Sequence, residues 1–319
     1  LDRSSAASDV YKRQAPMIQS LRILLVSLLA SLGLAAPLWA QAPAMRYIYP
    51  PPESGADVRM GYYWELMQAA LDETTPRWGP YVLQPSPKVM NAGRAELLLA
   101  ASSEISVMTR TTSVHREQAL RPVRIPLDKG LTGYRLFLIK AGTQARLNTV
   151  RTLAQLQAFS IGQGAVWVDT DILRAQGFNV VTSPTYEALL PMLEANRFDL
   201  LSRGVNEIGQ EYTAGSRTYP DLAIENRLLL YYPLPRYFFF PPTPEGEHLA
   251  RRTEEGLRML IKNGKFERRY QAFKKFILGD LNLAGRRVFN LNNPYLPPET
   301  PLTERELWDT LETELKTRP

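Results

Sequence analysis

Positively charged side chains are concentrated in residues 108–129, "MTRTTSVHREQALRPVRIPLDK". Only two acidic residues, Glu117 and Asp128, balance them there. A guanidinium can hold a carboxylate through two parallel, charge-assisted hydrogen bonds, so arginine is well suited to bind small organic anions. The segment therefore predicts a negatively charged partner. Its cations are Arg110, Arg116, Arg121, Arg124 and Lys129.

A second candidate for anion binding is the turn "GQG" at 162–164, which lies between a predicted strand and a predicted helix. Backbone N–H groups at the start of a helix can hold an anion, with the helix dipole behind them. The N–H groups of Gly164, Ala165 and Val166 are placed for this role, although such a turn also occurs for purely structural reasons. Trp167 follows directly and either stacks on a ligand or fills the core.

The composition excludes several kinds of chemistry. The chain has no cysteine, which excludes disulfides, thiol catalysis and thiolate metal sites, and its two histidines cannot form a histidine-rich metal site alone. We therefore expect no metal and no cofactor. The formal net charge of +6 on 319 residues is too small to imply a nucleic-acid partner.

The first 40 residues are not expected to belong to the mature fold. "SSAASDVYKRQ" (4–14) resembles a translated sequencing adapter, so we assign residues 1–16 to such an artefact. Residues 17–40 have the parts of a secretory signal peptide: Arg22, an apolar run at 23–36 and small residues at the end. The apolar run is shorter than the roughly 20 residues that span a bilayer. We expect cleavage after Ala40, a periplasmic protein and no stable membrane insertion.

From Met45 onward, short β-prone runs alternate with amphipathic helical patterns. This alternation predicts an α/β fold with mostly parallel sheets flanked by helices. A polar connection after Lys140 separates two such series, which predicts two lobes joined by hinge crossings near 136–141 and 230–237. The predicted division is lobe I at 41–138 plus 234–280, lobe II at 139–233 and a C-terminal extension at 281–319.

Two segments give more specific expectations. "YYPLPRYFFFPPT" (231–243) is interrupted by prolines and is predicted to be an extended crossing or edge segment, not a central strand. In the extension, Thr303 and Glu306 match a capping box. They predict a terminal helix carrying Leu307, Leu311 and Leu315, which we interpret as a packing arm.

Taken together, these patterns resemble the periplasmic solute-binding proteins of amino-acid ABC transporters, which have the two-lobed type II periplasmic-binding-protein fold. The resemblance covers about residues 45–278 and depends on the order of several segments. These are "SVMTRTTSVHREQAL", "GYRLFLIK", "TLAQLQAFSIGQGAVW", "NVVTSPTYEALLPMLEANRFDLL" and "GLRMLIKNGKFERRYQAFKK".

The resemblance implies roles for individual residues. Arg116 would clamp the solute's carboxylate, and Thr109 and Thr111 would supply hydroxyl groups beside it. The turn at 164–167 would contact the far side of that carboxylate. The lobes would close on the solute, and a transporter permease would be the protein partner. Composition alone favours the other interpretation, that Arg116 is a solvated residue in the first turn of a helix.

One strand departs from the family pattern. Amino-acid binders have an acidic residue there to hold the α-ammonium group, whereas this chain reads "DLLSRGVNE", with Arg203 and Gly204 at that place and Asn206 just beyond. A second cation facing Arg116 would repel an ammonium group and favour another negative group. We therefore expect a carboxylate-bearing solute other than an ordinary α-amino acid.

Two other functions can be weighed against solute transport. A dehydratase-like enzyme on the same scaffold would need a positioned acid or base, for which Glu104, Glu207 and the pair Asp169/Asp171 are the candidates. Carboxylates two positions apart diverge on a helix, so the pair is unsuited to shared acid–base work and we expect no enzyme. A ligand-sensing or interaction module without transport remains as the other alternative.

Overall fold

The computed structural model describes residues 44–51, 59–279 and 281–316. The predicted adapter, signal peptide and cleavage site lie outside these residues. None of the helices in the described part of the chain combines the length and the apolar character needed to cross a membrane.

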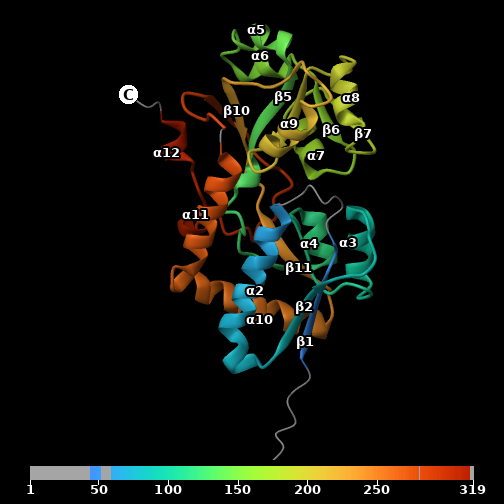
Figure 1. Ribbon diagram of the computed structural model, residues 1–319, viewed down its shortest axis with the longest axis vertical. Helices are drawn as coiled ribbons and strands as arrows, with labels where there is room; N and C mark the ends of the chain where they lie inside the picture. Colours follow the sequence, from blue (N-terminus) through green and yellow to red (C-terminus); the bar gives the residue numbers. More distant parts are fainter. Residues whose placement is uncertain (1–43, 52–58, 280, 317–319) are drawn as a thin grey trace, which may run out of the picture. The chain divides into compact units, whose positions relative to one another are not determined.

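Lobe I, at the bottom of Figure 1, contains two small sheets that backbone hydrogen bonds join. The carbonyl oxygen of Ile48 accepts from the N–H groups of Ser106 (2.8 Å) and Val107 (3.2 Å), directly before β3. The first sheet is the parallel pair β1-β2, and the second has the antiparallel order β3-β11-β4. The strands are β1 (Met45–Tyr49), β2 (Tyr81–Pro85), β3 (Met108–Thr111), β4 (Arg121–Val123) and β11 (Arg236–Phe240).

Five helices surround the strands of lobe I. They are α2 (Arg59–Trp78), α3 (Ala92–Ala100), α4 (Val114–Ala119), α10 (Pro244–Lys262) and α11 (Lys265–Leu278). Gly264 has a φ of 73° and separates α10 from α11, as expected for a glycine that ends a helix in the left-handed conformation. Helices α2, α10 and α11 supply much of the apolar surface of this lobe.

Lobe II, at the top of Figure 1, is built on one sheet with the order β12-β10-β5-β8-β6-β7, to which β9 adds beside β5. Strands β6, β7 and β8 are parallel, so their carboxyl ends meet at one edge. The strands are β5 (Tyr134–Lys140), β6 (Ile161–Gly164), β7 (Val180–Ser183), β8 (Leu200–Gly204), β9 (Leu222–Ile224), β10 (Leu228–Tyr231) and β12 (Arg287–Asn290). The helices are α5 (Gln144–Leu147), α6 (Leu153–Gln157), α7 (Val168–Ala175), α8 (Leu189–Glu194) and α9 (Ile208–Gly215).

The chain crosses between the lobes at residues 124–133 and 232–235. The two crossings touch, because Tyr232 donates its N–H to the carbonyl of Gly133 at 3.2 Å, and a Cβ on Gly133 would lie 2.2 Å from the carbonyl oxygen of Tyr232. The predicted boundary at 138 falls inside β5, which pairs with β8 from Arg135 onward. The first crossing therefore ends a few residues earlier than the sequence suggested.

The proline-punctuated segment is also placed differently from the prediction. Strand β11 lies between β3 and β4 and is the central strand of its sheet. The prolines stand at 233 and 235 before the strand and at 241 and 242 after it. All five residues of β11 therefore keep the N–H group that a central strand must donate.

The C-terminal extension forms what we call the strap, residues 281–316. It first adds β12 to the lobe II sheet beside β10, and Asn293 then donates to the carbonyl of Pro233 in the second crossing at 2.8 Å. Farther on, the ring of Trp308 lies against Gly130 in the first crossing. The strap therefore contacts a lobe II strand and both crossings.

The predicted terminal helix is shorter than expected, because only Leu315 of its three leucines lies in an α-helix. The strap has a 3₁₀ turn at Arg305–Leu307 and a short helix α12 at Glu312–Leu315, separated by Leu311 with a φ of 51°. Between them, the N–H of Asp309 is donated to the carbonyl of Lys129 at 2.8 Å, which draws the chain out of a helical path. Leu307 and Leu311 are nevertheless buried, so this segment does pack against the body of the protein.

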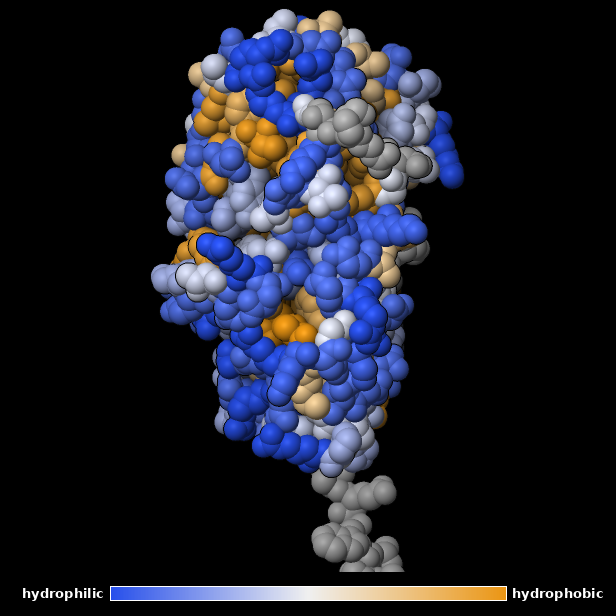
Figure 2. All heavy atoms as spheres, turned by 90° about the vertical axis from the view of Figure 1, so that its left-hand side faces the viewer, coloured by the Kyte–Doolittle hydropathy of each residue, from blue (hydrophilic) through white to orange (hydrophobic). Residues whose placement is uncertain are grey.

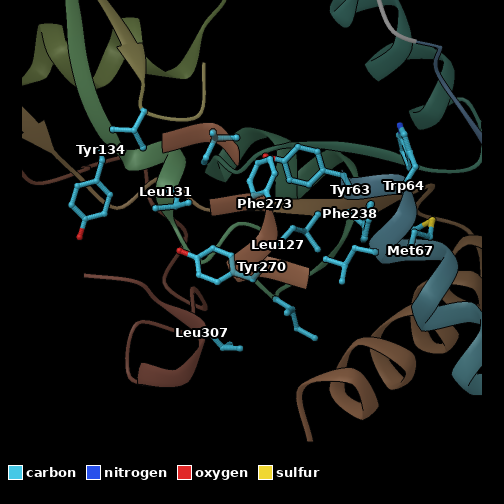
Figure 3. Close-up of a cluster of buried hydrophobic side chains, with 14 of the residues drawn as sticks. Tyr63, Trp64, Met67, Leu127, Leu131, Tyr134, Phe238, Tyr270, Phe273 and Leu307 are labelled. Carbon is cyan, nitrogen blue, oxygen red and sulfur yellow. The ribbon is translucent and has the colours of Figure 1, made fainter. Parts of the chain in front are cut away.

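One apolar cluster joins α2, α11, β11, the first crossing and the strap. Figure 3 shows side chains from each of them in this cluster. The labelled members are Tyr63, Trp64, Met67, Leu127, Leu131, Tyr134, Phe238, Tyr270, Phe273 and Leu307. The same cluster continues to Leu201 and Val205 in lobe II, so the two lobes share buried apolar surface.

Figure 2 shows the face of the protein that carries α11 and α12. Hydrophilic residues cover most of this face, and the apolar residues that reach its surface gather in separate patches. Charged and polar residues on the outside of the helices leave their apolar stripes to the core, as expected for amphipathic surface helices.

Candidate functional site

Arg116, the predicted carboxylate clamp, lies in α4 with a side chain that is 12% exposed. Its Nε and Nη2 donate to the same oxygen of Glu96 in α3, at 3.1 and 2.9 Å, and Nη1 donates to the carbonyl of Thr111. Three of the five N–H donors of a guanidinium are therefore used within the described residues. The ion pair fixes the position of the guanidinium and leaves it two further donors.

Thr109 and Thr111 lie two apart on β3, so their side chains point to the same face of the sheet. Arg236 of β11 stands directly opposite Thr111 and therefore shares this face. The hydroxyl of Thr109 and the Nε of Arg236 are both buried, and neither has a hydrogen-bond partner among the described residues. Arg236, which the sequence analysis did not single out, thus lies with the predicted threonines.

A buried polar chain connects this region to lobe II through Asp128. Its carboxylate accepts from the hydroxyls of Thr132 and Tyr63 and from the N–H of Gly130. Asn206 of lobe II then donates to the hydroxyl of Thr132 at 3.0 Å. Burial raises the pKa of Asp128, although the hydrogen bond from Thr132 and the charge of Arg236 oppose this shift. The predicted residue Asn206 therefore contacts the first crossing.

In the predicted anion-binding turn of lobe II, two backbone N–H groups already form hydrogen bonds within the protein. The N–H of Ala165 is donated to the carbonyl of Ser183 at 2.8 Å, and that of Trp167 to the carbonyl of Gly164 at 3.1 Å. Val166 is 82% exposed. Ala165 consequently does not offer its N–H to a solute, which differs from the sequence prediction.

Arg203 is buried and faces carboxylates of its own lobe. Its Nε and Nη2 donate to the two oxygens of Glu211 at 2.6 Å each, and Nη2 lies 3.2 Å from Glu207. Its guanidinium also lies over the ring of Trp167, with 4.4 Å between the Cζ atom and the ring centroid. The expectation that Arg203 presents an unbalanced positive charge to the solute is therefore wrong, because two carboxylates neutralise it.

A second buried arginine of lobe II, Arg135, was not identified from the sequence. It lies at the start of β5, opposite Gly204 at the end of β8. Its Nη2 is 3.2 Å from Asp169 in α7, and its Nη1 is 3.9 Å from Glu207. Burial opposes the charge of Arg135, but the negative charge of Asp169 raises its pKa. The hydrophobic setting of "YRLFLIK" gave no sign of a buried charge at this position.

Three other cations of the 108–129 segment also have acidic partners. Arg121 pairs with Glu247 at 2.5 Å, Arg124 with Glu117 at 2.7 Å and Lys129 with Glu267 at 2.9 Å. These acids come largely from distant parts of the chain. Four of the five cations seen in the sequence are therefore paired with acids in the fold.

Two surface hollows among the described residues lie elsewhere in lobe II. One, of about 580 Å³, is lined by Arg146 of α5, Gln155 of α6 and Phe159, which follows α6, and the other, of about 190 Å³, is lined by Lys140 and Asp199 among others. None of the predicted site residues lines either hollow. Within the described residues, no group of three or more histidine, aspartate or glutamate side chains is placed to hold a metal ion.

No family model matches this sequence, and no curated protein matches it. Solved structures do resemble it. An ancestral arginine-binding protein has a TM-score of 0.50 at 14% identity and covers 73% of this chain and 99% of its own. An arginine-specific periplasmic binding protein of Salmonella typhimurium has a TM-score of 0.51 at 15% identity, with 72% and 99% covered. A histidine kinase sensor domain similar to periplasmic binding proteins has a TM-score of 0.50 at 16% identity, with 75% and 98% covered.

Each of these three matches covers more than 70% of this chain. At such low identity they show the fold and nothing finer. The chain therefore has the two-lobed α/β fold of type II periplasmic binding proteins, as the sequence predicted.

Proposed function

We propose that this protein is an extracytoplasmic solute-binding protein that captures a small, carboxylate-bearing solute between its lobes and delivers it to an ABC transporter permease. The fold supports this role, because its structural neighbours include an ancestral arginine-binding protein and an arginine-specific periplasmic binding protein. The predicted signal peptide at 17–40 supports a periplasmic location. In such a mechanism, the solute contacts both lobes and shifts the population toward the closed form.

The observation that carries the proposal is the group of donors at one end of lobe I. Arg116 is fixed by Glu96 and has two N–H donors to spare within the described residues. On strands β3 and β11, the hydroxyl of Thr109 and the Nε of Arg236 are buried without a partner in that same part of the chain. Buried polar atoms are normally hydrogen-bonded, so atoms like these call for a partner such as a solute or an ordered water.

The chemistry of these groups indicates the class of solute. Two guanidinium groups and a hydroxyl, all carried by α4 and the adjacent strands β3 and β11, offer hydrogen-bond donors to a negatively charged group. On the lobe II side, Arg203 stacks on Trp167 and can hold that ring as a flat contact surface. Gly164, Val166 and Asn206 would complete the lobe II side of the site. A mono- or dicarboxylate with an apolar or planar body fits this arrangement.

Isothermal titration tests the proposal with four groups of compounds: short dicarboxylates, monocarboxylates, neutral α-amino acids and amines without a carboxylate. We expect at least one carboxylate to bind with a dissociation constant at or below about 10 µM, an affinity near −7 kcal/mol. We expect no measurable binding of amines that lack a carboxylate. Tight binding of such an amine, with no carboxylate bound, would contradict the proposed solute class.

A ligand-sensing role without transport is the second candidate. One structural neighbour is a histidine kinase sensor domain, and the strap links β10 with both crossings in a way that could report on lobe position. Both roles use the same solute site. Measuring solute uptake by the host distinguishes the two roles, because uptake depends on this protein only if it is a transport component.

A further inference from the structure

Arg135 is a charged residue that is almost wholly buried at the edge of lobe II. Its side chain is 2% exposed, and its partners come from several elements. Nη1 donates to the carbonyl of Thr132 at 3.0 Å and Nη2 to the carbonyl of Ser202 at 3.4 Å. A buried charge is tolerated only when it is paired and hydrogen-bonded. The burial of Arg135 at the edge of lobe II therefore requires these partners.

Two carboxylates from different helices converge on this guanidinium. Asp169 is the second residue of α7, and Glu207 directly precedes α9. Their oxygens lie 3.2 and 3.9 Å from Nη2 and Nη1 of Arg135. Asp169 also accepts a hydrogen bond from the hydroxyl of Tyr232 at 2.6 Å. The two acids thus form a negatively charged pair at the carboxyl end of the sheet, and the guanidinium lies between them.

The strand beside Arg135 provides the space that the guanidinium fills. Arg135 stands opposite Gly204, and a Cβ on Gly204 would lie 3.2 Å from Nη1 of Arg135 and 2.4 Å from Oδ1 of Asn206. A larger residue at 204 would displace these groups. The guanidinium therefore occupies a place that the glycine leaves open.

The hydrogen bonding around Arg135 is incomplete within the described residues. Four buried polar atoms there have no partner: Nε of Arg135, Oγ of Ser202, Oε1 of Gln163 and Oδ1 of Asn206. They include both donors and acceptors, and they surround the end of β8. A region of this kind is built to exchange hydrogen bonds with a small polar molecule or with water.

We infer that Arg135 is a specificity-determining residue, whose guanidinium fills the acidic end of the interlobe site and keeps cationic solutes from using Asp169 and Glu207. This inference rests on the proposed function, since it assumes that solutes reach this edge of lobe II. It explains how the site can contain several carboxylates and still suit an anionic solute. Without Arg135, Glu207 would keep its contact with Arg203 at 3.2 Å, whereas Asp169 would lose the guanidinium 3.2 Å away. Asp169, with Glu207 beside it, would then form a binding site for a guanidinium or ammonium group.

The substitution Arg135→Ala tests this directly, with methylguanidinium chloride as the probe. The variant keeps both acids and gains a space of guanidinium size. A ligand that binds only the folded state raises the melting temperature by mass action. We expect about 10 mM methylguanidinium to raise the melting temperature of the variant by several degrees and that of the wild type by less than about one degree.

Matched controls separate a specific site from general salt effects. Sodium chloride at the same concentration should give no comparable gain in the variant. The double variant Arg135→Ala/Asp169→Asn should lose most of the gain in melting temperature, because one of the two acids is then neutral. Arg135→Lys should show no gain, because its ammonium keeps the site filled. An equal gain in wild type and variant, or an undiminished gain in the double variant, would overturn the inference.

If Arg135→Ala does not fold alone, refolding yield replaces the melting temperature as the readout. We expect folded protein to be recovered with methylguanidinium and not with sodium chloride, whereas equal recovery would overturn the inference. These readouts do not depend on the natural solute. Absent rescue together with intact carboxylate binding would refute only the role of Arg135, and rescue without any carboxylate binding would refute only the proposed function.

Discussion

Replacing Asp309 by alanine is expected to lower the free energy of unfolding by about 3 kcal/mol, the size of effect seen when one partner of a buried ion pair is removed. Asp309 is one of the points at which the strap is fixed to the rest of the protein. Its carboxylate accepts from the hydroxyl of Tyr270 at 2.5 Å and from Lys274 at 2.7 Å, both in α11. Its backbone bonds to Lys129 in the first crossing and to Tyr134 at the start of β5.

The expected loss is at the lower end of the range for buried pairs, because Lys274 keeps a second partner. Its ammonium also lies 2.7 Å from Glu314 of α12. The side chains of Lys274 and Asp309 are 9% and 13% exposed, so solvent would only partly replace the lost contact. Chemical denaturation of wild type and variant measures the difference. A loss below about 0.5 kcal/mol, the level of an ordinary surface substitution, would show that the strap is not anchored here.

The pH dependence of this difference provides an internal control. Burial opposes ionisation of Asp309, but hydrogen bonds from Lys274 and Tyr270 outweigh it and hold the pKa of Asp309 below its ordinary value. A depressed pKa stabilises the folded state above the unfolded-state pKa of about 3.9, and this stabilisation is lost as the pH falls through the folded-state value. The difference between wild type and Asp309→Asn should therefore be constant from about pH 5 to 8 and shrink below about pH 4.

Arg116→Ala is expected to weaken solute binding by about 30-fold or more, because truncating one partner of a buried charge pair at a binding site costs about 2 kcal/mol or more. The alanine variant removes both spare donors and leaves Glu96 without its partner. The carboxylate of Glu96 would then repel an anionic solute. Titration with the best carboxylate from the proposed panel gives the change in dissociation constant.

Arg124→Ala is the matched control for Arg116. Arg124 belongs to the same cationic segment and also pairs with one glutamate, Glu117, at 2.7 Å. We expect Arg124→Ala to change the affinity less than about threefold, as is typical of a charge at the edge of a binding site. Arg116→Lys, which keeps the charge but loses the planar fork, should fall between the two. Equal losses for Arg116→Ala and Arg124→Ala would show that only the general charge of the segment matters.

The sequence predicted the fold well because the fold depends on local patterns. The alternation of β-prone runs and amphipathic helices predicted the α/β class, and such helix patterns end at local signals such as Gly264, whose φ of 73° separates α10 from α11. The prediction that the segment 231–243 contains no central strand was wrong, because it considered all the prolines of the segment together. Their positions, before and after Arg236–Phe240, leave the strand itself intact.

The charge environment of the site could not be predicted in the same way. Arg116 finds Glu96 twenty positions away, and Arg121 finds Glu247 at a separation of 126 residues. Such pairs depend on tertiary contacts that no local pattern reveals. Arg135 was missed for a related reason, because its neighbours in β5 are apolar and its acidic partners lie on two distant helices. The sequence showed a cation at Arg203 but gave no sign that Glu211 neutralises its charge.

Native mass spectrometry of the wild type and of Arg116→Ala, both purified from the host periplasm without denaturation, tests the central claim most directly. The claim is that Arg116 holds the carboxylate of a small solute between the lobes. It predicts that the wild type carries an additional mass that dissociates as a carboxylate-bearing molecule, and that the variant carries none. The same retained molecule in both proteins, or a retained molecule without a carboxylate, would contradict it.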